Sequence, residues 1–190
     1  NRFGLVAYYG SPTGRGLGIL GELPRAELNA ALQETAAAYA PYLPERIVLP
    51  AYHMVILVAN PHPPAYFHRV DLTLLEAWLT EAKEAETAVI LDMQPGRGDL
   101  MAEFERIRHL LYEPHVHLAI DPEFVMNDSQ IPGRHIGQLY AADINAIQSE
   151  LDAIAQEIGL NRVLILHQFV DRMLPDKEAI HDYAHVEMVI

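Results

Sequence analysis

The chain has no cysteine among its 190 residues, so it can form neither a disulfide nor a thiolate metal site, and it has no thiol nucleophile. It is also poor in basic side chains, with 13 Lys and Arg against 26 Asp and Glu and a formal net charge of −13. This balance argues against nucleic acid or an anionic membrane as a partner, because both are bound through clustered positive charge. No apolar run approaches the roughly 18 residues of a membrane-spanning helix. The length and the ordinary apolar content predict a single domain over residues 1–190.

Short apolar runs alternate with helical patterns along the whole chain. The runs predict strands near residues 3–9, 54–60, 87–93, 115–121, 163–168 and 185–190. Apolar residues at helical spacing predict helices near 24–40, 72–85, 100–112 and 143–158, and a short one near 175–181. Asp71, Asp99 and Asp143 are the expected N-caps, and Gly159 is the expected end of the fourth helix.

This alternation of strands and helices indicates an α/β protein with a parallel sheet. The six βα units fit an incomplete (β/α) barrel of TIM type or, as the alternative, an open doubly wound sheet. The barrel is preferred because polar residues follow several successive strands, as they do where a ring of strands contributes to one site. The shortfall from eight units predicts that the encoded chain continues beyond Ile190.

Polar side chains stand where four of the predicted strands end, which is where α/β proteins place their ligands. They are Asn60, Asp92, Gln94, Asp121, Glu123, His167 and Gln168. Crowded carboxylates raise one another's pKa, so that one can hold a proton while its neighbour stays ionised. We therefore expect Asp92, Asp121, Glu123 and His167 to converge in one hollow.

Paired carboxylates of this kind are the catalytic groups of glycoside hydrolases. The sequence thus predicts a glycosidase-type hydrolase whose partner is carbohydrate, either a polysaccharide or a cell-envelope glycan. Glu123 is the expected acid because it projects past its strand, and Asp121 or Asp92 is the expected nucleophile or base. The expected substrate-binding residues are His167, Gln168, Gln94, Asn60, Arg97 and Tyr9. No cofactor is expected, and no signal for an oligomeric state is found.

Two other functions stay open at this point. The same acids and His167 could bind a divalent metal that activates water, although no close-spaced ligand motif is present. Alternatively, the chain could be a non-catalytic extracellular surface or assembly protein that binds a glycan or a neighbouring subunit. The G-x-G-x-x-G match at residues 16–21 does not directly follow its strand, so a dinucleotide site is not expected.

Six segments spread over nearly the whole chain carry a family resemblance. They are Tyr9-Gly-Ser-Pro, Gly18-Ile-Leu-Gly-Glu22, Leu49-Pro-Ala-Tyr52, Leu91-Asp-Met-Gln-Pro-Gly-Arg97, Leu118-Ala-Ile-Asp-Pro-Glu-Phe124 and Leu166-His-Gln-Phe169. In these segments the chain resembles a family of secreted, in part lipoprotein-like, bacterial proteins without an established reaction. Relatives usually carry Trp in place of Phe124 and an acid in place of His53. The resemblance implies an exported βα-barrel-like domain, and a chain that starts at Asn1 rather than Met fits removal of a leader.

Overall fold

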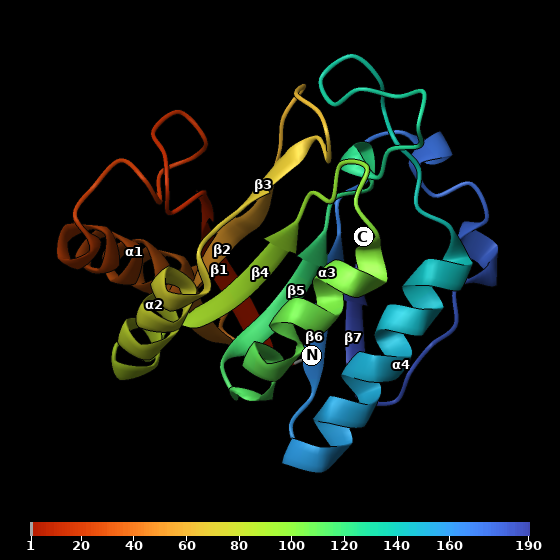
Figure 1. Ribbon diagram of the computed structural model, residues 1–190. Coiled ribbons are helices and arrows are strands. Elements are labelled where there is room, and N and C mark those ends of the chain that lie inside the picture. The colour runs from red at the N-terminus through yellow and green to blue at the C-terminus, as the bar shows by residue number, and fades with distance from the viewer. Residues whose placement is uncertain (1) are drawn as a thin grey trace. The chain divides into compact units, whose positions relative to one another are not determined.

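The computed structural model describes residues 2–190 as a mixed α/β chain (Figure 1). Its strands are β1 (Phe3–Gly10), β2 (Ile47–Ala59), β3 (Phe67–Arg69), β4 (Ala88–Met93), β5 (Val116–Ile120), β6 (Arg162–Leu166) and β7 (Val186–Val189). Its α-helices are α1 (Arg25–Tyr39), α2 (Leu72–Glu84), α3 (Leu100–Ile107) and α4 (Ala141–Ile158). Short 3₁₀ turns are η1 (Ala40–Tyr42), η2 (Arg108–Tyr112), η3 (Pro122–Phe124), η4 (Asp171–Met173) and η5 (Lys177–Ala179).

The strands form a sheet in the order β1-β2-β4-β5-β6-β7, with the short β3 antiparallel to the end of β2. The other six strands are parallel, which confirms the predicted parallel α/β architecture. Cα partners include Phe3 with Ile47 in β1 and β2, and Leu118 with Leu164 in β5 and β6. Within the described chain the order rises steadily and contains no reversal of the kind that defines doubly wound sheets.

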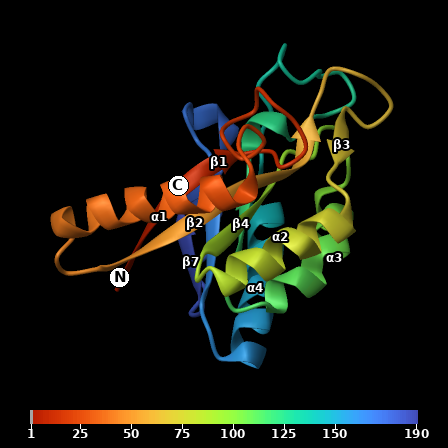
Figure 2. The same ribbon diagram turned by 90° about the vertical axis from the view of Figure 1, so that its left-hand side faces the viewer.

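The chain divides into two compact units. The first comprises Asn1–Ile56 and Val70–Leu91, and the second comprises Leu57–Arg69 and Asp92–Ile190. In the first unit α1 packs along β1 through a buried face (Figure 2). In the second unit α3 and α4 contact each other, and α4 packs on β6 and β7. All residues proposed below as reactive groups belong to the second unit, and the expectation of a single domain stays a prediction.

The strand β4 leads directly into the candidate site. All six of its residues are buried, including Asp92. A strand of a parallel sheet with both faces covered reads as a continuous apolar run rather than as an alternation, which is the pattern of residues 88–93. This otherwise apolar strand therefore places the carboxylate of Asp92 in a buried position.

The helix boundaries test the predicted capping residues. Asp71 accepts the Leu74 N–H at 3.2 Å and Asp99 accepts the Ala102 N–H at 2.8 Å, so both predicted N-caps are confirmed. Gly159 ends α4 in the left-handed conformation, with a φ of 70°, as expected.

The prediction that Asp143 caps α4 is wrong. The helix begins at Ala141, and Asp143 lies in its first turn. The N-cap residue Tyr140 offers no side-chain acceptor; instead Asp176 accepts the Ala141 N–H at 2.9 Å. The acceptor comes from a distant loop, which a local sequence pattern cannot reveal.

Three further elements differ from the expected ones. β2 begins at Ile47, well before residue 54, because its first part, Ile47–Met54, pairs with all of β1. β3 is only three residues long and too short to show a strand pattern. The helix expected near 175–181 is reduced to the single turn η5. Among the described residues, no helix combines the length and the apolar character needed to cross a bilayer.

Candidate active site

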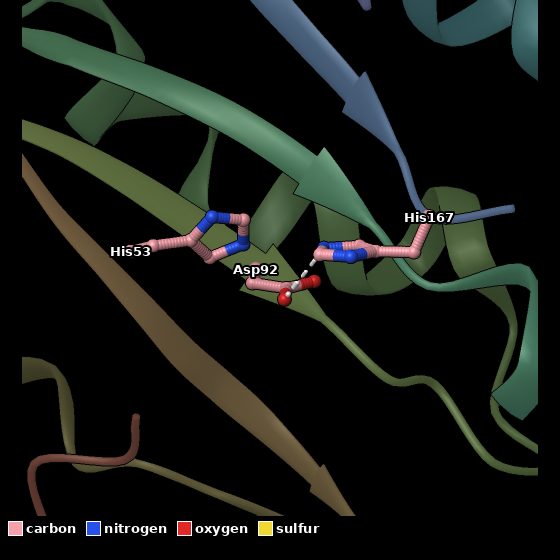
Figure 3. A group of neighbouring side chains, drawn as sticks. All are labelled: His53, Asp92 and His167. Atoms are coloured by element: carbon pink, nitrogen blue, oxygen red, sulfur yellow. Dashed lines mark ion pairs between the residues drawn. The ribbon is translucent and has the colours of Figure 1, made fainter. Parts of the chain in front are cut away.

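Asp92 and His167 form an ion pair although their strands are not neighbours. Asp92 lies near the end of β4 and His167 directly follows β6, while β5 lies between these two strands. The Nε2 atom of His167 is 3.2 Å from Oδ2 of Asp92 (Figure 3). The Asp92 side chain is fully buried, whereas that of His167 is 32% exposed. The buried carboxylate of Asp92 thus holds the imidazole of His167, which can still be reached from solvent.

Asp121 follows β5, the strand between the members of this pair. Its backbone N–H donates to the Met93 carbonyl at 3.0 Å, and the His167 N–H donates to the Ile120 carbonyl at 3.2 Å. These bonds join the ends of the three strands and bring Asp92, Asp121 and His167 together. Asp121 is buried, with 8% of the residue exposed.

The surroundings of Asp121 favour its protonated form. Burial, reinforced by the negative charge of Asp92, raises the pKa of Asp121 from 3.8 to about 6. His167 and the backbone N–H of Glu123 act in the opposite direction but do not cancel this rise. The hydrogen bond to Asp92 raises the pKa of His167 above its usual 6.5, although burial opposes it. In mildly acidic solution the site therefore holds a neutral carboxyl group beside a charged imidazole.

Glu123 lies in the turn η3 rather than on the strand. β5 ends at Ile120 and Pro122 begins the turn, so the side-chain alternation of the strand does not extend to Glu123. The Glu123 N–H donates to Oδ1 of Asp121 at 3.1 Å, and its negative charge adds to the rise in the pKa of Asp121. Glu123 is half-buried, whereas Asp121 before it is buried.

Gln94 is buried behind Asp121 rather than open to a ligand. The residue is 5% exposed; its Oε1 accepts the Ala59 N–H at 3.2 Å, and its Nε2 lies 3.5 Å from Oδ2 of Asp121. Its backbone N–H donates to the Leu57 carbonyl at 3.1 Å. Gln94 was expected to bind substrate, and in the structure its amide is engaged with the protein.

Two other predicted substrate-binding residues stabilise their own loops. Oδ1 of Asn60 accepts the His62 N–H at 2.9 Å, which closes a local turn after β2. Oε1 of Gln168 accepts a hydrogen bond from Lys177 Nζ at 2.9 Å, and Nε2 lies 3.5 Å from the Val170 carbonyl. Both residues shape the loops around the strand ends.

Arg97 connects two of these loops. Its guanidinium carbon lies 4.0 Å from the centroid of the Tyr66 ring, and its Nε donates to the Gln130 carbonyl at 3.0 Å. Cation–π stacking and the hydrogen bond together fix this arginine in place. Tyr9, by contrast, belongs to β1 in the first unit. There its ring lies 5.2 Å from the ring of the buried His53, which is also labelled in Figure 3.

The loop after η3 contains a residue that the sequence analysis overlooked. The Gly137 N–H donates to the Glu123 carbonyl at 2.7 Å, so this loop lies directly against the turn that carries Glu123. A Cβ atom at Gly137 would come within 2.3 Å of the Val125 carbonyl oxygen and 2.7 Å of that of Pro122. The sequence signals it only as one of two glycines, with Gly133, between Pro122 and Ala141.

Asp92 and His167 could also hold a cation. Their oxygen and nitrogen donors are 3.2 Å apart, near the about 3 Å expected for two adjacent ligands bound at 2.0–2.2 Å from one divalent ion. The same spacing fits the ion pair itself. No protein-family model, curated protein or solved structure matches this chain.

Proposed function

We propose that the chain is a glycoside-hydrolase-like enzyme that cleaves a polysaccharide or cell-envelope glycan by acid/base catalysis. The observation that carries the proposal is the position of Asp121, a buried carboxyl group of raised pKa beside the Asp92–His167 pair. Glycosidic cleavage needs one carboxyl group that gives a proton and a second carboxylate that attacks or activates water. Asp121 and Glu123 supply these two groups.

The proposed roles follow from exposure and charge. Asp121 donates its proton to the glycosidic oxygen as the bond between that oxygen and the sugar carbon breaks. Glu123, which is half-buried, either attacks that carbon or removes a proton from the attacking water. Asp92 is fully buried and cannot touch a sugar, so it acts through His167. The charged imidazole then stabilises the carboxylate left on Asp121 after the proton has gone.

This assignment changes the roles expected from the sequence. Glu123 was the expected acid, with Asp121 or Asp92 as nucleophile or base. Asp121 now takes the role of acid because burial and the charge of Asp92 both favour its protonated form. The steadily rising strand order supports the (β/α) barrel of TIM type as part of the proposal, and secretion after removal of a leader remains part of it.

The experiment is a reducing-sugar assay of the purified protein on a panel of polysaccharides and bacterial cell-wall glycans. Asp121→Asn and Glu123→Gln are each expected to lower kcat by about 10²- to 10⁴-fold, the usual contribution of a general acid or base. Asp128→Asn, an exposed acid in a nearby loop, is the matched control and should leave kcat unchanged. Full turnover by Asp121→Asn on a glycan that the unmodified protein cleaves would remove the assignment.

A divalent-metal-dependent hydrolase is the second candidate. The 3.2 Å separation of the donor atoms of Asp92 and His167 also suits two ligands of one ion. In that case a metal-bound water, not Glu123, would be the attacking group. Elemental analysis of the purified protein distinguishes the two candidates, since only the second requires bound metal.

A further inference from the structure

Gln94 links the end of β2 to the proposed acid. Its backbone N–H and its side-chain Oε1 both bond to β2, at the Leu57 carbonyl (3.1 Å) and the Ala59 N–H (3.2 Å). The remaining polar group, Nε2, faces Oδ2 of Asp121 at 3.5 Å. Because the Ala59 N–H holds the amide oxygen of Gln94, the position of the NH₂ group at the other side of the amide is fixed as well.

The Asp121 carboxyl group is consequently held at both oxygens. Oδ1 accepts the Glu123 N–H at 3.1 Å, and Oδ2 faces Gln94. Rotation of the carboxyl group would disturb both contacts at once. Asp92 and Glu123 also repel the ionised form of Asp121, and His167 attracts it.

We propose that Gln94 is a positioning residue, which orients the Asp121 carboxyl group by anchoring it to the end of β2. It does not touch the substrate, in contrast to the role expected from the sequence. The catalytic consequence rests on the proposed function, whereas the orientation of Asp121 does not. Loss of the anchor leaves the carboxyl group free to rotate, so proton donation suffers more than substrate binding.

The test uses two replacements of similar size. Gln94→Glu keeps an oxygen for the Ala59 N–H but puts a carboxylate, not a donor, against Asp121. Gln94→Met removes both polar contacts. We expect amide hydrogen exchange at Glu123 to become about tenfold faster in both variants at pH 8, because its bond to Asp121 is weakened. Exchange at Ala59 should accelerate only in Gln94→Met.

The same variants give a kinetic readout on a glycan that the protein cleaves. A positioning role predicts a fall in kcat with little change in KM, in Gln94→Glu as well as in Gln94→Met. Unchanged exchange at Glu123 in both variants, each shown to be folded by circular dichroism, overturns the proposal whatever the activity. Faster exchange at Glu123 in a protein that cleaves no glycan leaves the positioning role standing and removes only the proposed function.

Discussion

The imidazole of His167 reaches across the full width of β5 to meet the carboxylate of Asp92. Neighbouring strands lie about 4.8 Å apart, so β4 and β6 are separated by about 10 Å of sheet. A contact of 3.2 Å between residues of these strands requires both side chains to lean over the strand between them. The pair therefore meets close to Asp121, which follows β5 and interacts electrostatically with both groups.

Replacing Asp92 should alter the titration of both its neighbours. In Asp92→Asn the pKa of His167 is expected to fall, because its hydrogen bond to the carboxylate is the main cause of the rise. The pKa of Asp121 should fall as well, since the charge of Asp92 contributes to its elevation. NMR titration of the histidine ring protons and the carboxyl carbons measures both values. Unchanged titration of His167 would show that the ion pair is absent in solution.

Asp121 should reduce the stability of the fold above its own pKa. The folded state binds its proton more tightly than the unfolded chain does, so this contribution to stability is lost as the pH rises from 3.8 to about 6. Asp121→Asn has no charge to bury and should raise the free energy of unfolding at pH 7.5 by about 1 to 3 kcal/mol. Urea denaturation at pH 7.5 and pH 4 measures the difference, which should vanish at the lower pH. An equal effect at both pH values, or any effect in Asp128→Asn, would exclude this cause.

Glu103 is a buried acid whose negative charge is compensated by Arg69. Glu103 is 5% exposed on α3, and Arg69 on β3 binds both its oxygens, with Nε 2.8 Å from Oε2. Arg106 adds a longer contact of 3.5 Å. Arg69→Met should destabilise the protein by about 1 to 3 kcal/mol, a value below that of a fully buried pair because Arg69 is 45% exposed. The double variant Arg69→Met, Glu103→Met should recover part of this loss in urea denaturation, because no buried charge is left unpaired.

A methyl group at position 137 should displace the turn that carries Glu123. Gly137→Ala places Cβ against the carbonyl oxygens of Val125 and Pro122, and backbone atoms cannot rotate away as a flexible side chain can. We expect a loss of about 1 to 3 kcal/mol in stability and a large shift of the Glu123 amide signal in NMR spectra. Gly14→Ala is the control, because nothing lies within 4 Å of the added Cβ. An unshifted Glu123 amide would contradict this packing.

Chelation should not abolish hydrolysis if Asp121 is the acid. Dialysis against EDTA is expected to leave the rate of glycan cleavage unchanged, because both the proton and the attacking carboxylate come from the chain. The rate is compared before dialysis, after it, and after addition of Zn²⁺, Mn²⁺ or Mg²⁺. A loss that one of these ions restores would favour the metal-dependent hydrolase.

The parts of the fold that follow from local patterns could be predicted from the sequence. The continuous apolar run ending at Asp92, the helix starts at Asp71 and Asp99, and the αL glycine Gly159 are all short-range signals. The parallel sheet follows from the alternation of predicted strands and helices along the chain.

The residues of the site could be predicted only where they stand at the end of a strand. Asp92, Asp121 and His167 stand at the ends of strands that the sheet order brings together, so the strand pattern placed them correctly relative to one another. Glu123 did not follow this pattern, because Pro122 begins a 3₁₀ turn that ends the alternation. The engagement of Gln94 depends on Ala59, 35 residues away in sequence, and no local signal encodes it.

The capping of α4 by Asp176 has a consequence for how the chain is made. The residue that binds the first N–H group of this helix follows it by 35 positions, and Asn145 and Asp152 on the same helix also bond to the segment after Ala179. As the polypeptide leaves the ribosome, α4 emerges before any of these partners does. All of these bonds to α4 can form only when nearly all of the described chain has been translated. His167 is therefore synthesised before α4, which packs on β6, has all of its partners.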